Sequence, residues 1–229
     1  MKMLVLGLGC GVLLLAGCAR LAGPVPPPAL LAADAVRPDG LPEIGKWMLA
    51  HDGWPARWLG ATWEGKHLHE PVNVIFVDRA ATSPGEATNR LLRALAQAGF
   101  AVRLGHSSGY SAFIGGQRYE QFPASHATAI SDEPFEVNNN HGRLFGPCLF
   151  NGAYVCTAAF SRDRVAPLEQ VKHAYESFNR ARDAVAQNMD RKTAFKLTAF
   201  VPLGNHLLGR PDATTGDHDG VAVLLAAHE

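Results

Sequence analysis

The stretch FEVNNNHGRLFGPCLFNGAYVCTAAFSRD, residues 135–163, decides the fold of this chain. Two apolar runs flank Asn151-Gly152, a dipeptide that favours the type I′ turn of a β-hairpin because both residues tolerate a positive φ. An Asn run, a His and an Arg precede the first apolar run. The stretch therefore predicts an antiparallel hairpin with a polar entrance.

The polar entrance supplies the candidate site residues His141 and Arg143. In a strand these two side chains lie on one face, because successive side chains alternate. The guanidinium fork and the imidazole together suit a phosphate or carboxylate. The alternative is structural, with Arg143 pairing with a nearby acid such as Asp163 and fixing the hairpin.

The segment before the hairpin predicts a strand, a helix and a second strand. Residues 71–78 form a near-continuous apolar run, which is typical of a strand buried on both faces. Ser83 and Glu86 form a capping box for a helix that ends at Gly99. With a short strand at 100–104, the pattern predicts a right-handed βαβ unit with parallel strands.

The segment after the hairpin predicts a second helix from near Pro167, a strand at 194–201, a long loop at 204–220 and a final interior strand. The expected fold is a single α/β (α+β) domain. It has a mixed β-sheet with one βαβ unit, an antiparallel hairpin and two covering helices. All four tryptophans lie within residues 41–66, which favours core packing over an aromatic binding surface.

Charge and composition exclude one function class. Lys+Arg and Asp+Glu number 21 each in 229 residues, so no electrostatic attraction toward nucleic acid is expected. Hydrophobic residues make up 47%, which is enough for one folded domain.

The N-terminus has the pattern of a secretory signal peptide. Lys2 precedes an uncharged apolar run that is shorter than the about 20 residues of a membrane span. The sequence Leu15-Ala16-Gly17-Cys18 resembles the lipobox of bacterial lipoproteins. This resemblance implies cleavage before Cys18, acylation of Cys18 with chains such as palmitate, and anchoring in the lipid bilayer. Ala19, in place of the Asp that favours inner-membrane retention, points to the outer membrane facing the periplasm.

The expected organisation has three parts: a signal peptide at 1–17, a lipidated Cys with a Pro-rich tether at 18–42, and the globular domain at 43–229. The alternative for residues 19–42 is packing along the domain, since this stretch also contains Leu30, Leu31 and Val36.

Cys148 and Cys156 leave the question of a disulfide open. An oxidising compartment favours pairing. A two-residue turn, however, places Cys148 opposite Val155 and the two sulfurs on opposite faces of the hairpin, whereas a three-residue loop places them directly opposite each other.

The order of segments from Pro71 to Asp163 resembles the LssY C-terminal domain family of bacterial envelope proteins. The resemblance rests on PVNVIFV, LAQAGF, YEQFP, NNNHGRLFGP and YVCTAAFSRD. It implies a shared fold, and the family offers no settled activity to transfer.

Two function hypotheses follow. The first is a non-enzymatic envelope lipoprotein without a cofactor, whose periplasmic domain binds a ligand or scaffolds envelope protein partners. The second is a hydrolase that uses a divalent metal on a phosphoester or other anionic substrate. Its ligands would come from His141 and Arg143 together with His126, Asp163 or the weaker group Asp217, His218 and Asp219, whose Asp-x-Asp-Gly spacing lacks the closing Glu of an EF-hand.

Overall fold

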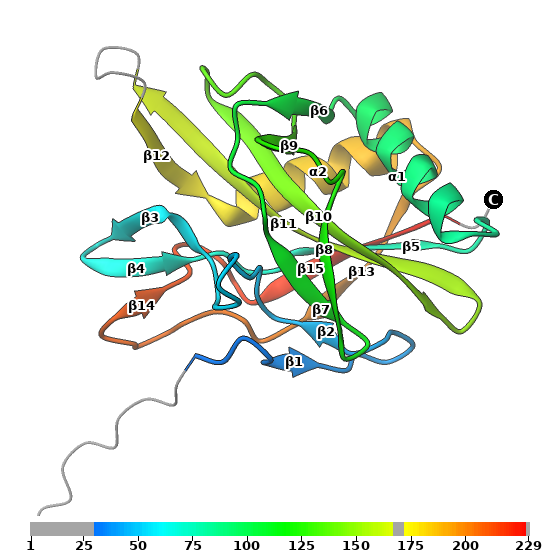
Figure 1. Cartoon of the computed structure of the whole chain (residues 1–229), viewed down its shortest axis with the longest axis horizontal. Helices are drawn as coiled ribbons and strands as arrows, with labels where there is room; N and C mark the ends of the chain where they lie inside the picture. Colours follow the sequence, from blue (N-terminus) through cyan, green and yellow to red (C-terminus); the bar gives the residue numbers. More distant parts are fainter. Residues whose placement is uncertain (1–29, 167–171, 228–229) are drawn as a thin grey trace, which may run out of the picture.

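The computed structural model describes residues 30–166 and 172–227 and shows a mixed α+β fold that is mostly β. Its main sheet is curled into a half-barrel (Figure 1). The strand order is β1 (Ala35–Val36), β2 (Ile44–Gly45), β7 (Ser111–Ile114), β8 (Gln117–Phe122), β10 (Asn139–Phe150), β11 (Ala153–Ala166), β5 (Val74–Asp78), β15 (Val221–Ala227) and β13 (Lys196–Pro202).

Three further strands extend this sheet, and three others form a small second sheet. β12 (Lys172–Ser177) pairs with β11, while β9 (Thr128–Ser131) joins β10 to β6 (Ala101–Leu104). The second sheet has the order β14 (Ala213–Thr214), β4 (Lys66–His69) and β3 (Arg57–Trp63).

The hairpin of β10 and β11 is confirmed with its two-residue turn. Asn151 has φ 48° and Gly152 has φ 75°, and Cys148 lies opposite Val155. Cys156 packs in the cluster beneath the helices and Cys148 against the cluster on the other face, and both are free thiols. The geometry therefore separates the two cysteines rather than pairing them.

Replacing Gly152 with Ala should lower the free energy of unfolding by about 1 kcal/mol, because the new Cβ would disfavour the positive φ. Chemical denaturation measures this loss. Gly85 is the control, since it lies in the first turn of a helix at a negative φ and a Cβ there meets nothing within 4 Å. An unchanged stability for the Gly152 variant would contradict the turn assignment.

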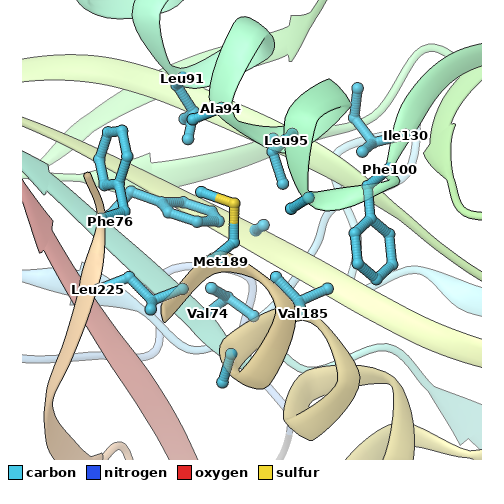
Figure 2. Close-up of a cluster of buried hydrophobic side chains, with 14 of the residues drawn as sticks. Val74, Phe76, Leu91, Ala94, Leu95, Phe100, Ile130, Val185, Met189 and Leu225 are labelled. Carbon is cyan, nitrogen blue, oxygen red and sulfur yellow. The ribbon is translucent and has the colours of Figure 1, made fainter. Parts of the chain in front are cut away.

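The core lies on both faces of the main sheet. Val74 and Phe76 of β5 pack in the cluster beneath the helices, whereas Ile75 and Val77 pack in the cluster on the opposite face. Figure 2 shows the first cluster, in which Met189 and other side chains of the two helices meet the sheet. This alternation confirms the prediction that this strand is buried on both sides.

Helix α1 (Pro84–Ala98) confirms the predicted caps. The Ser83 side chain accepts a hydrogen bond from the Glu86 N–H, and Gly99 ends the helix in a left-handed conformation. The Glu86 carboxylate reaches the N–H of Thr82 rather than that of Ser83, one residue earlier than the capping box predicts.

The predicted βαβ unit is wrong. β5 pairs with β15 in parallel and with β11 antiparallel, whereas β6 pairs with β9 at a distant part of the sheet. Val102 and Leu104 of β6 are exposed, so β6 does not have the two buried faces of a strand beside β5. The parallel neighbour comes instead from the C-terminal end of the chain.

The predicted start of the second helix is also wrong. Residues 172–177 form a strand that folds back on β11, and helix α2 (Phe178–Lys192) begins only after Ser177. The Ser177 hydroxyl accepts a hydrogen bond from the Arg180 N–H, which is a typical N-cap. Residues 167–171 of the predicted helix lie outside the described residues. The two helices do cover one face of the main sheet, as predicted (Figure 1).

The described part of the predicted tether packs against the domain. β1 pairs with β2, and the Leu41 side chain is buried. Of the apolar residues in this portion, Val36 packs against the core whereas Leu31 is exposed. The signal peptide and Cys18 lie outside the described residues, and within residues 30–166 and 172–227 no helix has the length and apolar character to span a membrane.

Candidate functional site

A small polar cavity of about 80 Å³ lies where the polar entrance of the hairpin meets the small sheet. It gathers side chains from β3, the end of β4, the loop after β6, and strands β10, β11 and β12. The lining residues are Trp58, Leu59, Glu70, Gly105, His106, Ser107, His141, Arg143, Asp163 and His173. Three of the predicted residues, His141, Arg143 and Asp163, therefore come together.

Arg143 is buried but does not pair with Asp163 as the structural alternative expected. Its Nε and Nη2 donate to the Ser107 carbonyl oxygen at 3.1 and 2.9 Å, and Nη2 also donates to the Ser107 hydroxyl. The guanidinium carbon lies 5.4 Å from the centre of the Tyr110 ring. One edge of the guanidinium fork, Nε and Nη2, therefore holds this loop, and a ligand could be gripped only by the remaining edge.

His141 is fixed by two hydrogen bonds. Its Nδ1 lies 2.9 Å from the Asn139 amide oxygen, which makes Nδ1 the protonated nitrogen, and its Nε2 lies 3.4 Å from the Ser161 hydroxyl. Burial, reinforced by the charge of Arg143, holds the pKa of His141 well below its usual value. The imidazole is therefore neutral at physiological pH.

Ser161, His141 and Asp163 follow one another in contact as the Ser, His and Asp of a hydrolase triad do. A substrate, however, could not reach the Ser161 hydroxyl. The His141 Nδ1 is 3.6 Å from an Asp163 carboxylate oxygen. The Ser161 hydroxyl, however, is buried, does not line the cavity and accepts a hydrogen bond from the Trp58 indole at 3.3 Å. A substrate in the cavity would not meet this hydroxyl, so the group orders the core.

Asp163 also binds His173, through the same oxygen that lies near His141. The His173 Nδ1 lies 3.1 Å from the Asp163 Oδ2, and this hydrogen bond raises the pKa of His173. Burial raises the pKa of Asp163. The Asp163 Oδ1 is buried, and no described residue forms a well-aligned hydrogen bond with it, because the nearby Trp58 indole donates to Ser161 instead.

His106 and Glu70 complete the cavity. Burial lowers the pKa of His106 to about 4, and its Nε2 has no hydrogen-bond partner in the described part of the chain. Burial raises the pKa of Glu70 to about 7, against the opposing effect of Arg143. No motif in the sequence distinguished these two residues, because each comes from a loop or strand end that only the tertiary fold brings to the hairpin.

The Glu70 carboxyl should make stability depend on pH. Between its ordinary pKa of 4.5 and the raised value of about 7, the folded state keeps a proton that the unfolded chain has lost. The contribution of Glu70 to the free energy of unfolding therefore falls as the pH rises through this window, by about 3 kcal/mol in all.

The Glu70→Gln variant tests this dependence, because Gln stays neutral. Denaturation of both proteins between pH 4 and 8 should show the variant gaining stability relative to the wild type as the pH rises. The buried histidines titrate in both proteins, so their effect cancels in the difference. A difference that does not change with pH would contradict the raised pKa.

The remaining predicted residues lie elsewhere. His126 is exposed and does not line the cavity. Asp217 accepts hydrogen bonds from the Ser177 hydroxyl and the Phe178 N–H at the start of α2. Asp219 pairs with Arg182, and the His218 Nε2 bonds the Asn205 amide oxygen.

The metal-assisted hydrolase hypothesis needs three ligands around one ion. Within residues 30–166 and 172–227, no group of three or more His, Cys, Asp or Glu side chains has an arrangement that could hold a metal ion. His141 and Asp163 do converge, but each is engaged in a hydrogen bond. The His141 ring bonds the Asn139 amide oxygen, and the Asp163 carboxylate bonds the His173 ring.

Comparisons with known proteins leave the family open. A scan of protein-family models, a search of curated proteins and a search of solved structures find no match to this chain. The resemblances to bacterial lipoproteins and to the LssY C-terminal domain family therefore stay predictions.

Proposed function

We propose that this chain is a lipid-anchored envelope protein whose periplasm-facing domain binds a small polar ligand in the cavity beside His141. One observation carries the binding half of the proposal. The Asp163 Oδ1 and the His106 Nε2 are buried without hydrogen-bond partners in the described part of the chain, and both residues line the cavity. Buried polar atoms without partners cost free energy, and a ligand in the cavity would remove that cost.

The unpaired groups indicate the chemistry of the ligand. Asp163 and Glu70 both contribute carboxyl oxygens to the cavity lining. Asp163 already bonds His173, whereas no described residue donates a hydrogen bond to the Glu70 carboxyl. The Asp163 carboxylate oxygens accept hydrogen bonds, so they suit a ligand with N–H or O–H donors. The Glu70 carboxyl can accept or donate, because its pKa of about 7 leaves it partly protonated. Two carboxyls beside one partly engaged guanidinium disfavour the anionic ligand that the sequence suggested. A cavity of about 80 Å³ suits a small molecule or the head group of a larger one.

The anchoring half of the proposal rests on the sequence Leu15-Ala16-Gly17-Cys18 behind an apolar run. Acyl chains on Cys18 would hold the domain at the membrane, since each buried methylene contributes about 0.8 kcal/mol. The domain would then meet its ligand, or an envelope protein that presents it, in the periplasm.

Calorimetric titration of the full-length protein in detergent tests the binding half. Ethanolamine is the first probe because it is small and carries both amine and hydroxyl donors. The wild type should bind it saturably, and Asp163→Asn should weaken binding about tenfold, because a charged hydrogen-bond acceptor is lost. Glu120→Gln is the control, since the Glu120 side chain is exposed and lies outside the cavity. Equal affinities in all three proteins, or no binding of ethanolamine by the wild type, would contradict the proposal.

A further inference from the structure

A second, larger cavity of about 760 Å³ opens beside the small sheet. Its lining residues belong mainly to β3, β14, the turn that precedes β3 and the start of the described chain at Leu30. The lining residues are Leu30, Ala50, Asp52, Trp54, Pro55, Arg57, Gly60, His69, Arg210, Asp212 and Ala213. Its volume is within the range of about 300–1,000 Å³ that is typical of small-molecule sites.

Trp54 gives this cavity an exposed aromatic wall. Its side chain is 62% exposed, whereas Trp47 and Trp58 are 2% and 3% exposed. The turn that carries it is fixed, because the Trp54 N–H donates to the Asp52 carboxylate and the Ala50 N–H donates to the Trp54 carbonyl. The sequence-based preference for core packing therefore fails for Trp54, and the hydrogen-bonded turn places its exposed indole at the rim of the cavity.

The charged side chains of the cavity balance. Arg57 and Arg210 face Asp52 and Asp212, and burial lowers the pKa of His69, which leaves it neutral at physiological pH. A cavity with no net charge favours neither an anion nor a cation. It favours a neutral ligand that carries both hydrogen-bond donors and acceptors.

Two lining groups have capacity left for such a ligand. The His69 side chain is more than nine-tenths buried, and its Nδ1 has no hydrogen-bond partner among the described residues. Arg57 is exposed, and no described residue forms an ion pair or side-chain hydrogen bond with it. Its guanidinium offers five N–H donors.

We infer that this cavity binds a neutral saccharide. The C–H groups of a sugar ring carry partial positive charge and suit the negative face of the Trp54 indole. The sugar hydroxyls suit the Arg57 donors and the Asp52 and Asp212 acceptors. The inference does not rest on the proposed function, because the two cavities are separate: Arg57 and His69 line this one, whereas the neighbouring residues Trp58 and Glu70 line the other.

An array of neutral oligosaccharides, followed by fluorescence titration of the strongest binder, tests the inference. The full-length protein is used in a polyoxyethylene detergent, since sugar-based detergents would compete. The wild type should show saturable binding, and Trp54→Ala should weaken it about tenfold through the lost stacking. Arg57→Ala should weaken it by a smaller factor.

Two controls separate the site from its surroundings. Trp63→Ala removes a tryptophan that packs on Tyr175 and does not line the cavity, and Glu70→Gln alters the other cavity. Both should bind the saccharide as the wild type does. The inference is overturned if no neutral oligosaccharide binds saturably, if only peptides or charged sugars bind, or if Trp54→Ala binds as tightly as the wild type. A Trp54 variant that unfolds would be recognised by its melting temperature. In that case Arg57→Ala, at an exposed position, provides the test, and wild-type affinity in that variant would overturn the inference.

Discussion

Replacing Arg143 with Met should lower the free energy of unfolding by about 2–4 kcal/mol, because hydrogen bonds from a charged donor are lost and a buried carbonyl is left without its partner. The Arg143 side chain is buried, and its Nε and Nη2 both bind the Ser107 carbonyl. Met preserves much of the packing but leaves that carbonyl without its donors. It also removes the cation whose charge lowers the pKa of the buried Glu70 carboxyl. Urea denaturation at pH 8, where Glu70 is ionised, measures the loss.

Two further variants make the Arg143 result specific. Arg37→Met is the matched control, since the Arg37 side chain is 75% exposed and its removal should change stability by less than about 0.5 kcal/mol. Adding Glu70→Gln to the Arg143 variant should restore part of the lost stability at pH 8, because the unpaired buried charge is then gone. An Arg143 variant as stable as the Arg37 variant would show that the cavity wall does not depend on the guanidinium.

Replacing Asn73 with Ala should lower the free energy of unfolding by about 2–5 kcal/mol, because two buried backbone groups lose their partners. The Asn73 amide donates to the Phe160 carbonyl at 2.8 Å, and its oxygen accepts from the Phe160 N–H at 2.9 Å. The Asn73 side chain thus makes the two backbone hydrogen bonds to β11 that a paired strand would make, at the position just before β5 begins. Thermal and urea denaturation measure the effect.

Asn188 is the matched control for Asn73. Among the described residues its amide donates only to the Ala184 carbonyl, one turn earlier in α2, so Asn188→Ala should cost well under 1 kcal/mol. Similar losses for the two variants would contradict the role given to Asn73. No pattern in the sequence predicts this role for Asn73, which stands within the otherwise apolar run at 71–78.

Local signals in the sequence were sufficient for the elements that local chemistry determines. The Asn151-Gly152 turn, the Ser83 and Gly99 caps of α1 and the two buried faces of β5 all depend on residues within a few positions of one another. The strand predicted at 194–201 and the interior strand at the C-terminus were likewise confirmed as β13 and β15.

The errors arose where distant segments decide the structure. Local order cannot show that β15 rather than β6 lies beside β5, because that pairing joins residues far apart in the chain. The same limit applies to α2. Tyr175 and its neighbours fit a helical stripe, but pairing with the end of β11 makes them a strand.

The candidate site was predicted in part for the same reason. His141, Arg143 and Asp163 belong to one hairpin, so their alternation and register brought them together as expected. Glu70 and His106 come from other segments, and the strong shifts of their pKa values result from burial that appears only in the folded domain.

The intact mass of the full-length gene product, purified from the membranes of a bacterial host, tests the central claim most directly. A lipid-anchored protein should give the mass of residues 18–229 plus the acyl groups on Cys18, and Cys18→Ala should abolish both the acyl mass and the membrane association. A wild-type product that retains residues 1–17, or that begins at another residue without acyl groups, would contradict the account.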